Sequence, residues 1–313
     1  MSHFPFAEKF NKNFQKSLIR IVPCGVEMNQ KAFAIFVGAI MIVSAFAGFV
    51  LMGGNQSGTI AVAGSPSVET FGVQGRVVDW SFDNLAETLE MSPESTVLAY
   101  WINLSASQNL TDAARAILPQ SFALSYGDQL YPTKIEKLAV AYFNKTWVEF
   151  HGIRPFPVSH SGLVIPYENY MMIPTSSEYV AVMGKPTLFG LQDSLKSVID
   201  VISGGFPTDK FTLAKGEQAD MQLAALGRGV PGSLLPGGYK EFYLGLSSAK
   251  GIGNNSFNVT AKYLQPDSSA DQKARTIASE YGLAYSNTGS LADVSGQVQA
   301  NDLQGLLAAF LSP

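Results

Sequence analysis

Two histidines are the side chains best suited to metal or acid–base chemistry in the long part of the chain that follows an apolar run at residues 32–53. His151 and His160 lie nine residues apart across a proline-rich stretch, and no cysteine is near them. A zinc site would therefore need further ligands from distant carboxylates. Ser159 and Ser161 flank His160, but the nucleophile pattern Gly-x-Ser-x-Gly and the phosphate-binding pattern Gly-x-x-x-x-Gly-Lys-Ser/Thr do not occur. These patterns favour a protein that is not an enzyme, with no catalytic, metal or cofactor residue.

Acidic side chains gather where the folded region is expected to begin. Asp83, Glu87 and Glu90 would share one face of a helix, with Asp79 just before it. Such a face is more typical of a solvated surface than of an acid–base pair. The chain after the apolar run carries a net charge of −7, which disfavours a nucleic-acid partner.

Aromatic residues are concentrated between residues 100 and 170. The core and the cross-strand pairs of a sheet account for most of such a concentration. One predicted strand offers an alternative, because its residues alternate between two faces. If Val148 and Phe150 face the core, then Trp147, Glu149 and His151 face solvent. These three residues are a candidate binding surface for a sugar or a protein partner.

Six Asn-x-Ser/Thr sequons occur, about three times as many as the composition would give by chance. All of them follow the apolar run. The pattern predicts a glycosylated exterior domain. The predicted sites are Asn55, Asn103, Asn109, Asn144, Asn254 and Asn258.

The apolar run at residues 32–53 contains no charged residue and is long enough to cross a bilayer as one helix. The 31 residues before it carry a net charge of +3. Positive charge next to a span keeps that end in the cytoplasm, so we expect a single-pass protein of the cell membrane with its C-terminal domain outside. The bilayer would be one partner. Small residues four apart (Ala34/Gly38 and Ser44/Gly48) permit close helix packing, so a homo-oligomer is one option.

Alternatives remain at the N-terminus. Residues 1–31 form either a basic interfacial helix or, if translation starts at Met28, partly a start-site artefact. The small-x-small pattern at residues 61–63 would permit cleavage, although the run is longer than most signal sequences and favours a retained anchor. A pilin-like protein processed near Lys31 is a further alternative.

The remaining sequence predicts an α+β fold. Residues 54–75 are rich in Gly, Ser and Thr and predict a flexible tether. Hydrophobic periodicity then predicts antiparallel sheets with helices packed on one face, compatible with two ferredoxin-like half-domains at residues 76–204 and 205–313. Strands are expected at 96–104, 138–143, 146–151, 179–183, 239–246, 256–264, 283–286 and 292–298, and helices near 109–118, 191–202, 267–281 and 303–310, with 206–238 as loop.

Together these features predict a non-enzymatic, membrane-anchored surface protein. Its outer domain would be a structural or interaction module, or an accessory subunit of an envelope assembly with a protein partner. The alternative is an extracytoplasmic ligand- or glycan-binding protein that uses the aromatic-rich first half-domain.

Overall fold

The computed structural model of this chain describes residues 76–119, 121–131, 133–153, 164–176, 178–227, 235–249 and 255–312. All of them belong to one compact unit that spans residues 65–313. The predicted basic segment, apolar run and tether lie outside the described residues, as do Asn55, Asn254 and His160. Among the helices within those ranges, none is both long and apolar enough to cross a membrane.

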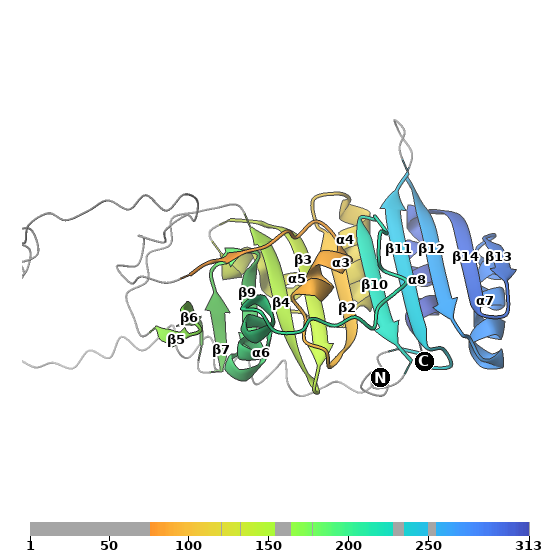
Figure 1. The fold of residues 1–313 in the computed structure, drawn as a ribbon. Helices are drawn as coiled ribbons and strands as arrows, with labels where there is room; N and C mark the ends of the chain where they lie inside the picture. The colour runs from red at the N-terminus through yellow and green to blue at the C-terminus, as the bar shows by residue number, and fades with distance from the viewer. Residues whose placement is uncertain are drawn as a thin grey trace, which may run out of the picture. The chain divides into compact units, whose positions relative to one another are not determined.

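A 12-stranded sheet forms the frame of this unit, in the order β13-β14-β12-β11-β10-β2-β3-β4-β9-β7-β6-β5 (Figure 1). Every neighbouring pair in it is antiparallel, and β1 and β8 form a separate parallel pair. The predicted α+β fold with antiparallel strand pairing is confirmed, and the strands form one large sheet. The strands are β1 (Val78–Asp79), β2 (Thr96–Asn103), β3 (Ile135–Phe143), β4 (Thr146–Ile153), β5 (Ile165–Tyr167), β6 (Tyr170–Pro174), β7 (Tyr179–Val182), β8 (Gly184–Lys185), β9 (Thr187–Leu191), β10 (Met221–Leu226), β11 (Glu241–Ser248), β12 (Ser256–Leu264), β13 (Ala284–Asn287) and β14 (Leu291–Gln299).

Strands from before and after residue 204 meet in the middle of this sheet. β2 pairs with β10, and Ala99 lies opposite Ala224. Each part contains a three-stranded meander, β2-β3-β4 or β10-β11-β12, and places its last strand, β9 or β14, beside that meander. The division into residues 76–204 and 205–313 stays a prediction, because the two parts share one continuous sheet.

One face of the sheet, here called the helical face, is covered by four helices. They are α4 (Gln108–Ile117), α5 (Phe122–Leu130), α7 (Ser268–Glu280) and α8 (Leu303–Leu311), and α8 follows a short 3₁₀ turn at Ala300–Asp302. Burial of apolar side chains between a sheet and its helices is the main stabilising contribution in such a layer. The core on this face includes Leu98, Tyr100, Leu110, Val140, Leu244, Val259, Ile277, Leu306 and Phe310.

The opposite face is covered only in part, by α3 (Leu85–Glu90), α6 (Gln192–Ile202) and residues 203–220, here called the crossing segment. Figure 1 shows this segment passing in front of β4, β3 and β2. Phe211 in the crossing segment packs in one cluster with Trp101 and Leu195. The expectation that all helices pack on one face is therefore wrong. Helices also cover the second face because β2 is apolar on both sides. Tyr100 belongs to the core of the helical face, and Trp101 belongs to the core under α3 and α6.

Beyond β11, the only contact between a described covering segment and this side of β12, β14 and β13 that the hydrogen bonds and ion pairs show is the ion pair of Lys262 with Glu217 of the crossing segment. We call this side the open sheet face. Burial along β12 alternates as the sequence predicts, with Phe257, Val259, Ala261 and Tyr263 buried and Asn258 exposed. The open sheet face consists mainly of Asn258, Thr260, Ala284, Ser286, Ser295 and Gln297, and it also carries the charged side chains of Lys262 and Asp293.

Local signals located several elements correctly. α7 begins after Asp267, whose carboxylate accepts hydrogen bonds from the Ser269 and Ala270 N–H groups, and it ends before Gly282 at φ +65°. α5, β9 and β10 were not predicted. β10 is buried on both faces, so its residues show no polar alternation that would mark a strand.

Candidate functional site

The predicted binding surface on β4 lies inside the protein. Glu149 and His151 are fully buried, and Trp147 is half-buried against the core of the helical face. The alternation along β4 is as expected, with Val148 and Phe150 on the other side. The expectation that Trp147, Glu149 and His151 face solvent is wrong, because α5 covers this side of the strand.

Glu149 connects α5 to the sheet. Its carboxylate accepts hydrogen bonds from the N–H groups of Phe122 and Ala123, the latter at 3.0 Å, at the start of α5. The Nε2 atom of His151 lies 2.8 Å from the same carboxylate, and the Tyr131 hydroxyl lies 2.7 Å from the Nδ1 atom of His151. The two ring nitrogens of His151 thus contact two different partners, one on each side of the imidazole.

This chain of hydrogen bonds runs from Tyr131 through His151 and Glu149 to the backbone of α5. Burial, and after it the Glu149 carboxylate, raise the pKa of Tyr131 above its ordinary value. Because Glu149 and His151 are fully buried, a solution reactant cannot reach them in this conformation. The arrangement stabilises α5, whose N-terminal N–H groups need acceptors.

The aromatic residues near this network form an interior layer and not an exposed platform. The Phe122 ring lies 4.7 Å from the Tyr179 ring, 5.2 Å from Phe189 and 5.8 Å from Trp147, measured between centroids. Trp147 stacks on Tyr179 at 5.9 Å. Offset and tilted contacts of this kind stabilise a core. Tyr126, 38% exposed, lies at the edge of this layer.

On the opposite face, two more buried polar residues hold covering segments in the same way. Gln222 on β10 accepts from the Leu85 N–H of α3 at 2.7 Å. Glu241 on β11 accepts from the Thr212 and Leu213 N–H groups of the crossing segment at 2.9 and 2.7 Å. Three polar residues that point inward from strands therefore bind backbone donors of three covering segments. Sequence patterns alone could not identify these pairs, because the partners lie 26 to 137 residues apart.

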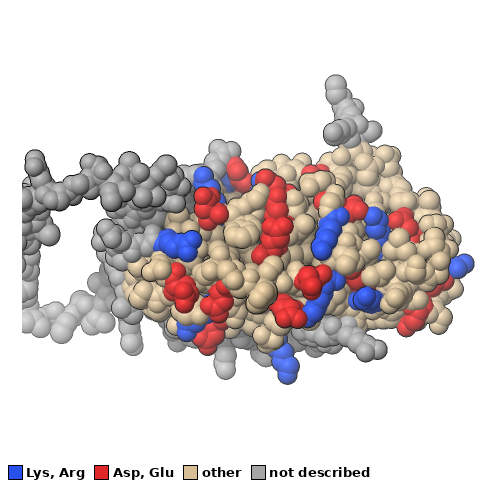
Figure 2. Space-filling view, viewed as in Figure 1, with Lys and Arg blue, Asp and Glu red and all other residues tan. Residues whose placement is uncertain are grey.

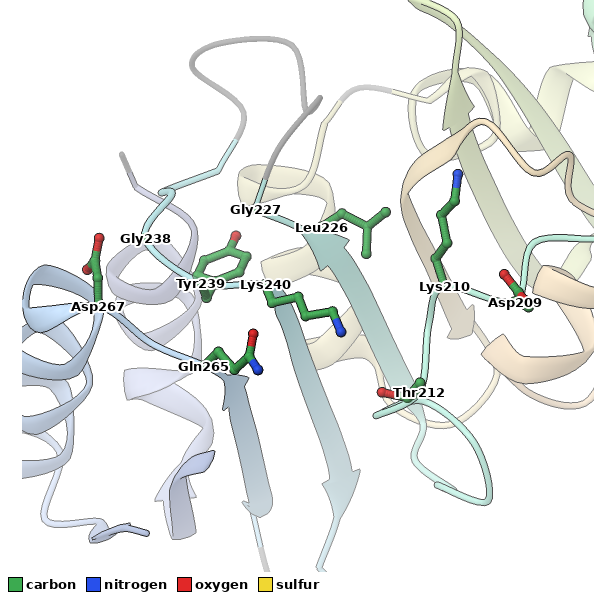
Figure 3. Close-up of a pocket in the computed structure, with 10 residues that line it drawn as sticks. All are labelled: Asp209, Lys210, Thr212, Leu226, Gly227, Gly238, Tyr239, Lys240, Gln265 and Asp267. Atoms are coloured by element: carbon green, nitrogen blue, oxygen red, sulfur yellow. The ribbon is translucent and has the colours of Figure 1, made fainter. Parts of the chain in front are cut away.

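A hollow of about 880 Å³ opens between the crossing segment and the adjoining ends of β10, β11 and β12 (Figure 3). Lys210 extends from the crossing segment, and its ammonium group donates to the Glu94 carbonyl at 2.8 Å. Tyr239 is buried, which raises the pKa of its hydroxyl. The lining residues are Asp209, Lys210, Thr212, Leu226, Gly227, Gly238, Tyr239, Lys240, Gln265 and Asp267.

The side chains that line this hollow include both positively and negatively charged groups. Within the described chain, no hydrogen bond or ion pair engages the side chains of Lys240 and Gln265. Asp267, in contrast, is occupied as the cap of α7, and the Ala270 and Ser269 hydrogen bonds lower its pKa. Ammonium and amide donors beside carboxylates suit a polar or zwitterionic small molecule. The residues that line this hollow come from four separate segments of the chain, so no local sequence pattern indicates it.

The described sequons differ in what their side chains do. The amide nitrogen of Asn109 donates to the Asn255 side chain at 2.8 Å, and the Asn103 side chain accepts from the Ser105 N–H. Asn144 is exposed at the β3–β4 turn, and its φ of +49° together with +64° at Lys145 indicates the predicted tight turn. Asn258 is exposed on the open sheet face.

Among the described residues, no three His, Cys, Asp or Glu side chains are grouped as a metal would require. Of the acidic residues expected near the start of the fold, Asp83 precedes α3 and pairs with Lys137, while Glu87 accepts from the Asp83 N–H. The expected shared helix face therefore forms only in part, because Asn84 caps the helix after Asp83.

The sequence matches no protein-family model, and no curated protein matches it. Two solved structures, both of the protein TP0453, are similar to this chain. Crystal form I of TP0453 is 11% identical in sequence to this chain, with a TM-score of 0.44. The match covers 74% of this chain and 99% of the TP0453 chain. Crystal form III is 13% identical, with a TM-score of 0.43. That match covers 73% of this chain and 99% of the TP0453 chain.

Proposed function

We propose that this chain is a non-enzymatic, membrane-anchored surface protein whose α+β domain binds a protein partner in the membrane or envelope. The apolar run at residues 32–53 would be the anchor, with the N-terminus in the cytoplasm and the domain outside. The charge difference across the run and the six sequons support this orientation.

The observation that carries the proposed interaction role is the open sheet face. It lies on three paired strands, β12, β14 and β13, and its residues are mostly small hydroxyl, amide and alanine side chains. Figure 2 shows that most of the surface over β12 and β14 is uncharged. The core on the helical face holds these strands rigid, so binding would lose little conformational entropy. A broad surface of this kind suits a protein better than a small molecule, which needs a concave site.

Co-purification with substitutions on this face tests the proposal. The full chain would be purified from native membranes in mild detergent, and every protein present at fixed stoichiometry identified. Ser286→Arg with Ser295→Arg places two large charged side chains on the open sheet face, and Ser279→Arg on the exposed side of α7 is the matched control. We expect the partner to be lost only from the double variant. Purification of the wild type without a stoichiometric partner would contradict the proposal.

The hollow beside Lys240 favours a second candidate function, the binding of a small polar ligand outside the cell. This replaces the predicted aromatic surface, whose residues are buried, with a site of different chemistry. Thermal shift with a panel of amino acids and simple sugars tests it. Lys240→Ala should remove any shift, whereas Lys215→Ala, at an exposed position of the crossing segment outside the hollow, should keep it.

A further inference from the structure

One sequon lies directly beside a surface hollow. Asn144 is at the tip of the β3–β4 hairpin, and it lines a hollow of about 550 Å³ between that hairpin and the start of α6. This volume lies in the range of roughly 300–1,000 Å³ that is usual for small-molecule sites. The other lining residues are Phe143, Thr146, Glu178, Leu191, Gln192, Asp193, Ser194 and Ser197.

The hairpin and the helix hold this hollow in a defined shape. The hydroxyl groups of Thr146 and Ser194 lie 2.7 Å apart and join the turn to the first turn of α6. Two residues with left-handed φ values, Asn144 and Lys145, form the two-residue turn itself. The side chain of Asn144 therefore starts from a fixed position at the rim.

The lining offers both kinds of contact that a sugar ring needs. Leu191 is 38% exposed, an unusual exposure for a leucine in this protein, and it provides an apolar wall. Glu178 and Gln192 supply a carboxylate and an amide, and no hydrogen bond within the described chain engages either side chain. A pyranose ring presents C–H groups on its faces and hydroxyl groups at its edge, so it can contact all three residues.

We propose that Asn144 is N-glycosylated and that the first sugars of its glycan pack into this hollow against Leu191, Glu178 and Gln192. The occupant is thus a modification of this chain itself. Asn258 provides a contrast, because it stands on a flat strand where its side chain accepts from Gln297 at 2.9 Å, and a glycan there would extend into solvent. The inference rests on the exterior location in the proposed function.

Matched substitutions in two hosts test the inference. Asn144→Asp removes the amide nitrogen that carries a glycan and keeps a residue type that tolerates left-handed φ. Asn258→Asp is the control. Each full-length variant would be purified from its native cells and from a host that does not glycosylate, and its midpoint of thermal unfolding compared with that of the wild type. Peptide mass spectrometry would report the occupancy of both sites.

We expect the Asn144 peptide to carry a glycan. Asn144→Asp should lower the midpoint by about 2–4 °C in protein from native cells and leave it unchanged in the unglycosylated protein. Asn258→Asp should have no effect in either. Leu191→Ser, which removes the apolar wall and keeps the sequon, should lower the midpoint more in the glycosylated protein than in the unglycosylated one.

Two results would overturn the inference and leave the proposed function standing. One is an unmodified Asn144 peptide in a protein that protease reaches from outside intact cells. The other is a modified Asn144 whose loss leaves the midpoint unchanged in native protein. If protease does not reach the domain from outside, both the proposed location and this inference are wrong.

Discussion

Replacing Glu149 with glutamine tests whether this buried carboxylate stabilises α5. The substitution keeps the size and shape of the side chain and removes its charge. The carboxylate accepts from two backbone N–H groups of α5 and pairs with His151. A glutamine has one acceptor oxygen, so its NH₂ group must face one of the donors that the carboxylate now satisfies.

The size of the effect follows from these contacts. A hydrogen bond to a charged group contributes about 1.5–3 kcal/mol, and a buried donor left without an acceptor costs about 1–3 kcal/mol. In Glu149→Gln, one of the hydrogen bonds that the carboxylate now accepts is lost, and the remaining ones are made to a neutral amide. We therefore expect Glu149→Gln to lower the free energy of unfolding by about 2–4 kcal/mol. A domain with the usual stability of about 5–15 kcal/mol would still fold.

Urea unfolding of the full chain in mild detergent measures this loss. Trp147 is a useful probe, because its ring stacks on Tyr179 and Phe189 next to α5. Hydrogen–deuterium exchange would localise the effect, since the amides of Phe122–Leu130 should lose protection before those of β11 and β12. Glu280→Gln, at an exposed position near the end of α7, is the matched control and should change stability by less than about 0.5 kcal/mol.

A stability of Glu149→Gln within 0.5 kcal/mol of the wild type would refute this reasoning. So would a large loss with unchanged exchange in α5, because the carboxylate would then act elsewhere in the fold.

Three further predictions concern other contacts. Gln222→Leu leaves the first N–H group of α3 without its acceptor and removes the donor to the Glu217 carbonyl and the Tyr243 hydroxyl, so unfolding free energy should fall by about 1–3 kcal/mol, with faster amide exchange in α3 and the crossing segment. Gly184→Ala would place a Cβ against the Val78 backbone, so limited proteolysis should cleave near a displaced β1. Hydrogen bonding, above all from Tyr285, lowers the pKa of Asp271, so its stabilising contribution is present above about pH 4 and is lost as the pH falls through the folded-state pKa. Urea unfolding of Asp271→Asn should differ from wild type at pH 7 and converge with it in acid.

Elements whose signals lie close together in the chain were predictable from sequence. α6 was expected at residues 191–202 and is observed at Gln192–Ile202, because its apolar residues recur at helical spacing. The β3–β4 turn was expected at Asn144 and Lys145, where both residues have positive φ.

Elements that depend on distant partners were not predictable. α5 contains Gly127 and a non-helical Tyr126, and its N-terminus is held by Glu149, which follows it by more than 25 residues. β10 shows no polar alternation, since the cores on both sides of the sheet bury it. The hollow beside Lys240 combines residues from the crossing segment, the end of β10, the segment before β11 and the loop after β12, and no local spacing relates them.

β4 shows where the two kinds of information separate. Its sequence determined that Trp147, Glu149 and His151 share one side and Val148 and Phe150 the other, because successive residues of a strand point to opposite faces. Only the tertiary structure decided that both sides are buried, with α5 packed on one and Phe82 stacked against Phe150 on the other. The sequence likewise determined the order and type of most local elements, the charge difference and the sequons. Which face of each strand remains open to a partner was decided by long-range packing, because a covering element can come from any part of the chain.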